Sequence, residues 1–249
     1  MLYEGFILDK VNCNISIIQD RFGLKYGTDA YLLSAFLPNS SKSTVCEAGC
    51  GSGIISLLLL KGGKAHSAFC VDVQNHLCEI AKENAAVNGV QERMTVTCQD
   101  VLTYRPEREC DSFVCNPPYM KDNSGKVSEH TEKYIARHET SADIYDFAKC
   151  AYRSLKDGGN CYFVYRPDRC ADIIHAMKSA RIEPKIITFV YATVDHESCL
   201  MLIKGKKGAS SGMMVTKPLI IYKNEAGGEY TDDMKYIYDN QSFPKGFFR

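Results

Sequence analysis

The chain has 249 residues, of which 45% are apolar and 24% charged, and it carries 30 basic and 30 acidic side chains. This composition is that of an ordinary globular domain and excludes a disordered tail, a collagen-like fibre and a charge-dense coiled coil. The chain opens Met-Leu-Tyr-Glu, without a secretory signal, and its longest apolar run, at 54–60, is too short to cross a membrane. We therefore expect a cytoplasmic protein without membrane contact, in which any nucleic acid is held by a local basic patch.

The twelve cysteines and six histidines form no pattern typical of a metal site. No two cysteines are spaced as C-x-x-C, and no histidine completes a ligand pair at short spacing. A zinc site needs such pairs, so we expect no metal. Most of the cysteines lie in apolar, β-branched stretches, where a reduced thiol serves as a small apolar side chain.

Apolar patterning predicts a small β appendage, a helix and then a regular alternation of strands and helices. Residues 5–8 and 14–19 predict two short strands, and Thr28 precedes a helix of about nine residues that stops at Pro38. Strands are then predicted at 44–48, 67–72, 93–98, 111–115 and 160–165, and helices at 53–61, 75–88, 142–156 and 168–180. This alternation predicts a Rossmann-like α/β fold whose mostly parallel sheet is covered on both faces.

The last third of the chain departs from the alternation. Strands near 185–194 and 198–203 have no helix between them and predict an antiparallel hairpin at one edge of the sheet. The polar stretch 120–140 predicts a long loop, and 205–212 a flexible basic turn before a strand at 219–222 and a final helix from about 232. We expect an N-terminal appendage and helix in 1–40, a main domain in 41–204, and a C-terminal part in 205–249 that packs on that domain.

A glycine-rich loop with the spacing E-x-G-x-G-x-G follows the strand at 44–48. Its residues are Glu47, Gly49, Gly51 and Gly53. Glycines allow a sharp turn and a close ligand, and the next helix offers N–H groups at its start. The spacing differs from the G-x-G-x-x-G of dinucleotide-binding proteins. A carboxylate here would repel a pyrophosphate but suits the ammonium and sulfonium of S-adenosyl-L-methionine, so we expect that cofactor.

Two more acids follow the next two strands. Asp72 ends the strand at 67–72, where a carboxylate can accept hydrogen bonds from both ribose hydroxyls. Asp100, followed by Val101, comes after the strand at 93–98 and is placed to contact the adenine. The carboxyl ends of parallel strands meet at one edge of a sheet, so we expect these residues to complete the cofactor site.

The tetrapeptide Asn116-Pro117-Pro118-Tyr119 follows the strand at 111–115. Two prolines stop the strand and hold the backbone carbonyls rigidly. The amide oxygen of Asn116 and the carbonyl of Pro117 are suited to accept the N–H bonds of an amine conjugated to a ring and to aim its lone pair at a methyl group. Tyr119 can stack on a flat substrate. We therefore predict amine methylation driven by proximity and fixed dipoles.

These motifs together resemble the class I methyltransferases that use S-adenosyl-L-methionine to methylate planar amide or amine nitrogens. Three further segments are similar to the bacterial tRNA1(Val) adenine-N6-methyltransferase family: Tyr26 to Leu33, Ala136 to Glu139, and Pro218 to Tyr222 with Gly228 to Thr231. The resemblance implies the seven-stranded class I sheet and methylation of the adenosine 3′ of the anticodon. It also implies that Thr28 and Asn116 line the cofactor with the glycine loop and the two acids, while residues 116–119 grip the target base.

A basic surface is the expected RNA contact. Residues 160–223 contain ten basic and five acidic side chains, among them the adjacent Lys206 and Lys207, and phosphates bind such surfaces in a salt-dependent manner. Arg137 is a further candidate for contacting substrate. The sequence leaves the oligomeric state open.

Three alternatives remain at this level. Methylation of a protein glutamine amide fits the same tetrapeptide, because that nitrogen is also planar. A noncatalytic RNA-binding module on the same fold, or a dinucleotide-dependent oxidoreductase, would belong to other classes. The intact Asn116 to Tyr119 argues against a noncatalytic module, and the glycine spacing argues against an oxidoreductase.

Overall fold

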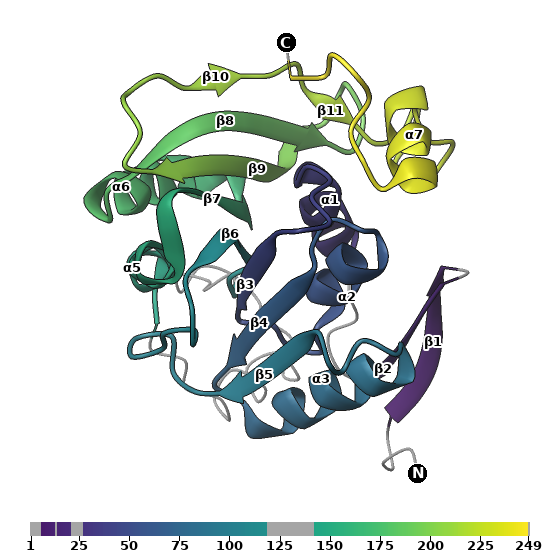
Figure 1. Cartoon of the computed structure of the whole chain (residues 1–249). Coiled ribbons are helices and arrows are strands. Elements are labelled where there is room, and N and C mark those ends of the chain that lie inside the picture. Colours follow the sequence, from purple (N-terminus) through teal and green to yellow (C-terminus); the bar gives the residue numbers. More distant parts are fainter. Residues whose placement is uncertain (1–5, 13, 21–26, 119–141, 249) are drawn as a thin grey trace, which may run out of the picture.

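A nine-stranded sheet forms the centre of the computed structural model, which describes residues 6–12, 14–20, 27–118 and 142–248 (Figure 1). Its strands run in the order β10-β8-β9-β7-β6-β3-β4-β5, with β11 also paired to β8. Their bounds are β3 (Thr44–Ala48), β4 (Ser67–Asp72), β5 (Met94–Cys98), β6 (Cys110–Cys115), β7 (Leu155–Tyr165), β8 (Ile182–Tyr191), β9 (Ser198–Lys207), β10 (Met214–Val215) and β11 (Leu219–Ile220). Among these pairs, only those that involve β9 are antiparallel, which confirms the Rossmann-like α/β fold.

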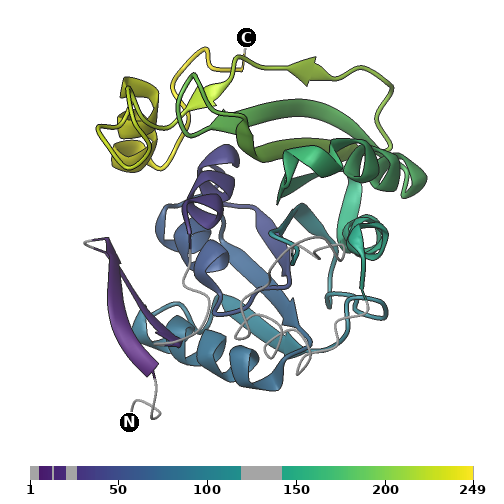
Figure 2. The same ribbon diagram turned by 180° about the vertical axis from the view of Figure 1, so that it is seen from behind.

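Helices cover both faces of the sheet (Figures 1 and 2). On one face lie α1 (Thr28–Phe36), α2 (Ile54–Lys61), α3 (Asn75–Val87) and α7 (Asp232–Asn240). On the other lie α5 (Ile144–Ser154) and α6 (Cys170–Ser179), the latter joined to β7 by the short 3₁₀ helix η1 (Pro167–Arg169). In α5, Ile144, Phe147, Ala148 and Ala151 are buried, the spacing of one helix face that packs on a sheet. Each face thus has its own apolar core.

The N-terminal hairpin of β1 (Phe6–Asn12) and β2 (Ile15–Asp20) lies beside α3 and is not part of the central sheet. The fully buried Asn84 of α3 acts as a strand partner for β2. Its Oδ1 accepts from the N–H of Ile18 at 2.6 Å, and its Nδ2 donates to the Ile18 carbonyl at 3.0 Å. The same Nδ2 donates to the carbonyl of Ser52 in the glycine loop at 2.9 Å. Asn84 therefore ties the appendage to the expected cofactor loop.

Three details differ from the expectation. The β8–β9 pair is antiparallel as predicted, but β9 lies between β7 and β8, and β10 and β11 extend the sheet beyond β8. The prediction of a turn from Gly205 is wrong for residues 205–207, because β9 continues through them: Gly205 and Lys206 pair with both β7 and β8, and Lys207 pairs with β8. Gly205 allows this, since a Cβ there would overlap the Cε of Met177 on α6. Strand β7 begins at Leu155 and not at 160.

The predicted loop at 120–140 lies outside the described residues. Within the described ranges, no helix is long and apolar enough to span a membrane.

Candidate active site

The carboxyl ends of four neighbouring strands bring the predicted residues together. Ala48 at the end of β3 is paired with Cys115 at the end of β6, so the glycine loop and Asn116 begin at the same level on adjacent strands. On the other side, Ala48 is paired with Val71, and Asp72 with Cys98 of β5. Adjacent strands are about 4.8 Å apart, so this edge places the glycine loop directly beside Asn116.

The three glycines of the loop all adopt left-handed backbone conformations. Gly49, Gly51 and Gly53 have φ values of 66°, 53° and 81°. A Cβ on Gly53 would also lie 2.5 Å from the Cε of Met94, whereas a Cβ on Gly51 would meet no atom within 4 Å. The N–H groups of Gly49 and Cys50 both donate to the carbonyl of Val71, at 2.8 and 3.1 Å. The turn is therefore fixed against β4, and it leaves open space above Gly51.

Glu47 is the buried acid of the site, with 1% of its surface exposed. Its Oε2 accepts from the backbone N–H of Ser56 at 2.9 Å and from the Ser56 hydroxyl, so it also anchors the first turn of α2. The pKa of Glu47 is raised to about 8, mainly by burial and to a smaller extent by the nearby Asp72, against the lowering effect of these two hydrogen bonds. A cationic ligand would favour the ionised form of this carboxyl.

Asp72 closes the glycine turn from the end of β4. One carboxylate oxygen accepts from the N–H of Gly51 at 2.9 Å and the other from the N–H of Gln74 at 2.9 Å, and only 6% of the residue is exposed. Its carboxylate is therefore held next to the loop, at the position expected for a group that accepts ribose hydroxyls.

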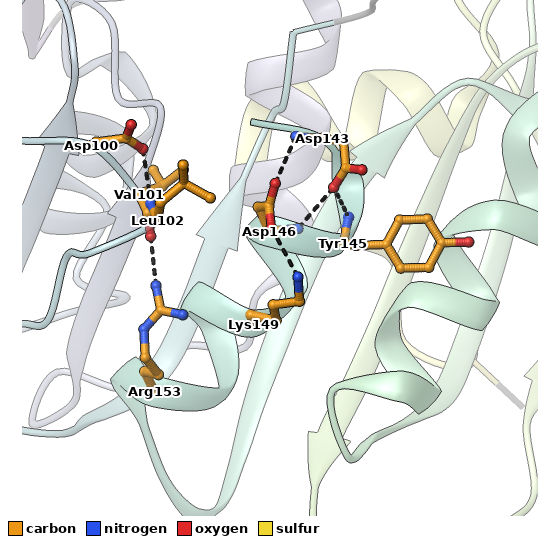
Figure 3. Close-up of polar contacts among 8 residues, drawn as sticks. All are labelled: Asp100, Val101, Leu102, Asp143, Tyr145, Asp146, Lys149 and Arg153. Atoms are coloured by element: carbon orange, nitrogen blue, oxygen red, sulfur yellow. Dashed lines mark hydrogen bonds and ion pairs between the residues drawn. The ribbon is translucent and has the colours of Figure 1, made fainter. Parts of the chain in front are cut away.

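Asp100 and Val101 follow β5 in a turn that α5 holds in place (Figure 3). The Asp100 side chain accepts from the N–H of Leu102 at 2.8 Å. The carbonyl of the buried Val101 accepts from Nη2 of Arg153 on α5 at 2.5 Å. Arg153 lies in the last turn of α5, so this contact ties the segment after β5 to that helix.

A capping box that the sequence reasoning missed fixes the start of α5. The Asp143 side chain accepts from the N–H groups of Tyr145 and Asp146, and the Asp146 side chain accepts from the N–H of Asp143 (Figure 3). The D-x-x-D spacing was a usable signal for it, since an acid three residues after the cap is the usual pattern.

Asn116 is half-buried and donates from Nδ2 to the Oδ2 of Asp29 at 2.8 Å. After it, Pro117 is buried and Pro118 is exposed. Asp29 lies in the first turn of α1, next to the predicted cofactor residue Thr28, so α1 reaches the same edge. Asp29 lies within the family-like segment Tyr26 to Leu33, but no local sequence pattern indicates a role for it. The predicted substrate residues Tyr119 and Arg137 lie outside the described residues.

Lys206 and Lys207 are not brought to this edge. Lys206 is paired with Asn160 of β7, which is level with Ser112 near the start of β6, so both lysines lie toward the opposite end of the sheet. Lys207 is 8% exposed, and its ammonium donates to the carbonyl of Leu155 at 2.7 Å. A contact of Lys206 with RNA outside the site stays a prediction, whereas the Lys207 ammonium is already bound by the protein.

The charges at the edge fit a cationic cofactor. Within the part of the chain that the structure describes, no lysine, arginine or histidine forms an ion pair with Glu47, Asp72 or Asp100. Acids without a described basic partner beside a glycine turn and a helix start would bind the ammonium and sulfonium of S-adenosyl-L-methionine favourably, and the bound cation would favour the ionised form of Glu47. The same described residues contain no cluster of three or more metal-type ligands.

Sequence comparisons agree with this chemistry. The family model "Methyltransferase small domain" matches residues 23–178. A tRNA1(Val) (adenine(37)-N6)-methyltransferase of Phocaeicola vulgatus is 34% identical over 90% of this chain and 95% of its own length. The enzyme of the same name from Aliivibrio salmonicida is 28% identical over 65% of this chain. This chain covers 66% of the length of the Aliivibrio salmonicida enzyme and 59% of the length of the enzyme of the same name from Vibrio parahaemolyticus.

Solved structures share the architecture. A predicted O-methyltransferase of Agrobacterium tumefaciens superposes with a TM-score of 0.67 and 18% identity over 87% of this chain and 98% of its own. Geranyl diphosphate methyltransferase in complex with S-adenosyl-L-methionine gives a TM-score of 0.52 at 14% identity over 72% of this chain and 84% of its own. The chain therefore has the class I methyltransferase fold and belongs to the methyltransferase small domain family, within the group of the bacterial tRNA1(Val) (adenine(37)-N6)-methyltransferases.

Proposed function

We propose that the protein transfers a methyl group from S-adenosyl-L-methionine to the exocyclic N6 amine of an adenosine in tRNA, at the anticodon-loop position 3′ of the anticodon. The observation that carries this proposal is the pairing of Ala48 with Cys115, since it puts the glycine turn and Asn116 side by side. The Phocaeicola relative, similar over 95% of its length, supports the tRNA1(Val)-like substrate.

The cofactor would be held at the acidic edge. Asp72 and Asp100 would accept hydrogen bonds from its sugar and base, and the glycine turn with Thr28 would lie against it. Glu47, buried beneath the turn, would favour its positive charge. When bound, the cofactor supplies a methyl group on a positively charged sulfur: as an amine attacks in line, the N–C bond would form while the S–C bond breaks and S-adenosylhomocysteine leaves. The methylated, positively charged nitrogen would then lose a proton to water.

Asn116 and Pro117 would activate the amine without a strong base. The adenine N6 lone pair is delocalised into the ring, so the free amine is a poor nucleophile. If the Asn116 side-chain oxygen and the Pro117 carbonyl accept its two N–H bonds, the nitrogen is drawn toward tetrahedral geometry. These acceptors also stabilise the positive charge that grows on nitrogen during transfer, so they bind the transition state more strongly than the substrate.

Two arginines at the same edge are candidates for holding the RNA backbone. Arg166 follows the end of β7 directly, and Arg169 ends η1; their side chains are 38% and 43% exposed and pair with Asp168 and Asp172. Phosphates could compete with those exposed carboxylates at little cost, because exposed ion pairs are weak. We propose that this edge meets the anticodon loop, with the target base turned out of its stack.

The test is transfer of labelled methyl from S-adenosyl-L-methionine to total tRNA and, separately, to total protein. We expect label in tRNA that nucleoside mass spectrometry identifies as N6-methyladenosine, and transfer by Asn116→Ala that is about 10²- to 10³-fold slower. Label only in protein would support glutamine methylation. Cofactor binding without transfer to either would support a noncatalytic RNA-binding module.

A further inference from the structure

A hydrogen bond between Asp29 and Asn116 joins α1 to the tetrapeptide at the site, although 87 residues separate the two in the chain. From this contact we infer that Asp29 is a positioning residue: it fixes the orientation of the Asn116 amide so that its oxygen accepts from the substrate amine. This inference deepens the proposed function and rests on it.

The donor and acceptor roles in this pair are unambiguous. An ionised carboxylate only accepts hydrogen bonds, so the group that lies 2.8 Å from Oδ2 of Asp29 must be the amide nitrogen of Asn116. Rotating that amide by 180° would put two oxygens in contact. The amide oxygen is therefore held on the side away from Asp29. An amine substrate needs this acceptor, because a flipped amide would present N–H groups to its N–H groups.

Asp29 is itself held rigidly. Its other oxygen, Oδ1, accepts from the N–H of Ala30 at 2.8 Å, and an acid in the first turn of a helix is favoured by the helix dipole. A Cβ on Gly27, the residue before α1, would lie 2.7 Å from Oδ1 of Asp29, so only glycine fits at position 27 without moving the carboxylate. Both carboxylate oxygens are thus engaged, one with its own helix and one with Asn116.

The helix that carries Asp29 is anchored at its other end. Lys64 is 3% exposed, and its ammonium donates to the carbonyls of Ser34, Ala35 and Leu37 at 2.9, 3.0 and 2.6 Å. The hydroxyl of Tyr31 donates to the carbonyl of Tyr238 at 2.8 Å. Because α1 cannot shift without breaking these bonds, it can hold a side chain to the tolerance that catalysis needs.

The charge of Asp29 would add to its orienting role. A carboxylate bonded to the amide nitrogen polarises the amide and makes its oxygen a better acceptor. Within the described ranges, no basic side chain forms an ion pair with Asp29. Its negative charge therefore remains available as the substrate nitrogen becomes positive.

An exchange of the two side chains tests the inference. Asp29→Asn removes the charge and lets the Asn116 amide flip; we expect kcat to fall about 30-fold with the KM for S-adenosyl-L-methionine unchanged, somewhat less than the loss typical for a missing oxyanion contact. Asn116→Asp sets two carboxylates against each other, and we expect at least the same loss. In the double variant the new amide on α1 donates to the new carboxylate of the tetrapeptide, whose second oxygen is an acceptor in either orientation. Activity should therefore return to within about fivefold of the wild type.

The controls separate positioning from folding. Asp232→Asn changes an exposed first-turn acid of α7 in the same way, and we expect neither kcat nor melting temperature to move. A double variant as inactive as the product of the two single losses would overturn the inference, since losses that simply multiply mean that the two side chains act independently.

A second readout does not depend on the substrate. The side-chain amide resonances of Asn116, assigned by their loss in Asn116→Asp, should shift in Asp29→Asn. Unchanged resonances would overturn the inference. If the wild type methylates no tRNA while these resonances shift, the proposed function fails and the Asp29–Asn116 contact stands.

Discussion

The acidic side chains at the two ends of the central sheet differ in their partners and in the direction of their pKa shifts. At the amino end, Asp111 pairs with Lys156 at 2.7 Å and accepts from the N–H of Thr44; burial alone would raise its pKa, but these contacts lower it overall. At the carboxyl end, burial raises the pKa of Glu47 to about 8, and no described basic side chain pairs with it or with Asp72. The protein thus pairs an acid with a base at the amino end and leaves acids without a described basic partner at the carboxyl end, where a bound cation would favour the ionised form of Glu47.

The largest expected effect comes from Asn116→Ala. This change removes an acceptor that acts mainly in the transition state, so we expect kcat to fall about 10²- to 10³-fold while the dissociation constant of S-adenosyl-L-methionine stays within about twofold. Single-turnover methyl transfer and calorimetry measure the two quantities. Loss of cofactor affinity with intact turnover at saturation would show that Asn116 belongs to the cofactor pocket.

A matched pair of alanine variants compares the two ends directly. Asp72→Ala should weaken S-adenosyl-L-methionine binding about 10- to 100-fold, because it removes both a charge and the acceptor that closes the turn at Gly51. Asp111→Ala should lower the melting temperature and leave cofactor affinity unchanged. Equal effects of the two variants on affinity would break the comparison.

The pKa of Glu47 predicts a pH dependence. Its folded-state pKa, about 8, lies above the ordinary 4.5, so the folded protein holds a proton that the unfolded chain releases. The stability this proton provides is complete below about pH 4.5 and is lost as the pH rises through about 8. Denaturant unfolding of the cofactor-free protein should show this decline, and Glu47→Gln should flatten it. A decline that persists in Glu47→Gln would assign it to other groups.

The same carboxyl should couple cofactor binding to pH. The ionised form attracts the cation more strongly, so affinity should rise with pH until about 8. Glu47→Gln serves as the reference: the amino group of the cofactor titrates in the same way with both proteins, so the difference between their affinities reports Glu47 alone. If the two proteins show parallel curves between about pH 6 and 9, Glu47 does not sense the bound charge.

The smallest effect is expected at the amino end. Lys206 lies there, away from the acidic edge, so Lys206→Ala should change tRNA affinity less than Arg169→Ala does. Filter binding at two salt concentrations measures both, and the arginine variant should reduce the salt dependence by about one phosphate contact. A larger effect of Lys206 would mean that RNA crosses the whole sheet.

The sequence predicted the site edge better than the C-terminal strands. Strands at 44–48 and 67–72 were correct to the residue, because short, mostly apolar runs end there at a glycine or an acid that starts a loop. The end of β9 was missed because Gly205-Lys206-Lys207 has the local pattern of a turn, and only pairing with strands on both sides overrides it. Asp29 was missed because its partner is distant in the chain, and no local pattern reports such a contact.

A structure with S-adenosylhomocysteine bound tests the central claim most directly. We predict its sulfur between the glycine turn and the Asn116 side chain, with its ribose on Asp72. Two results would contradict the account: density for the nucleoside away from the carboxyl ends of β3, β4 and β5, or a sulfur atom that does not lie next to the Asn116 side chain.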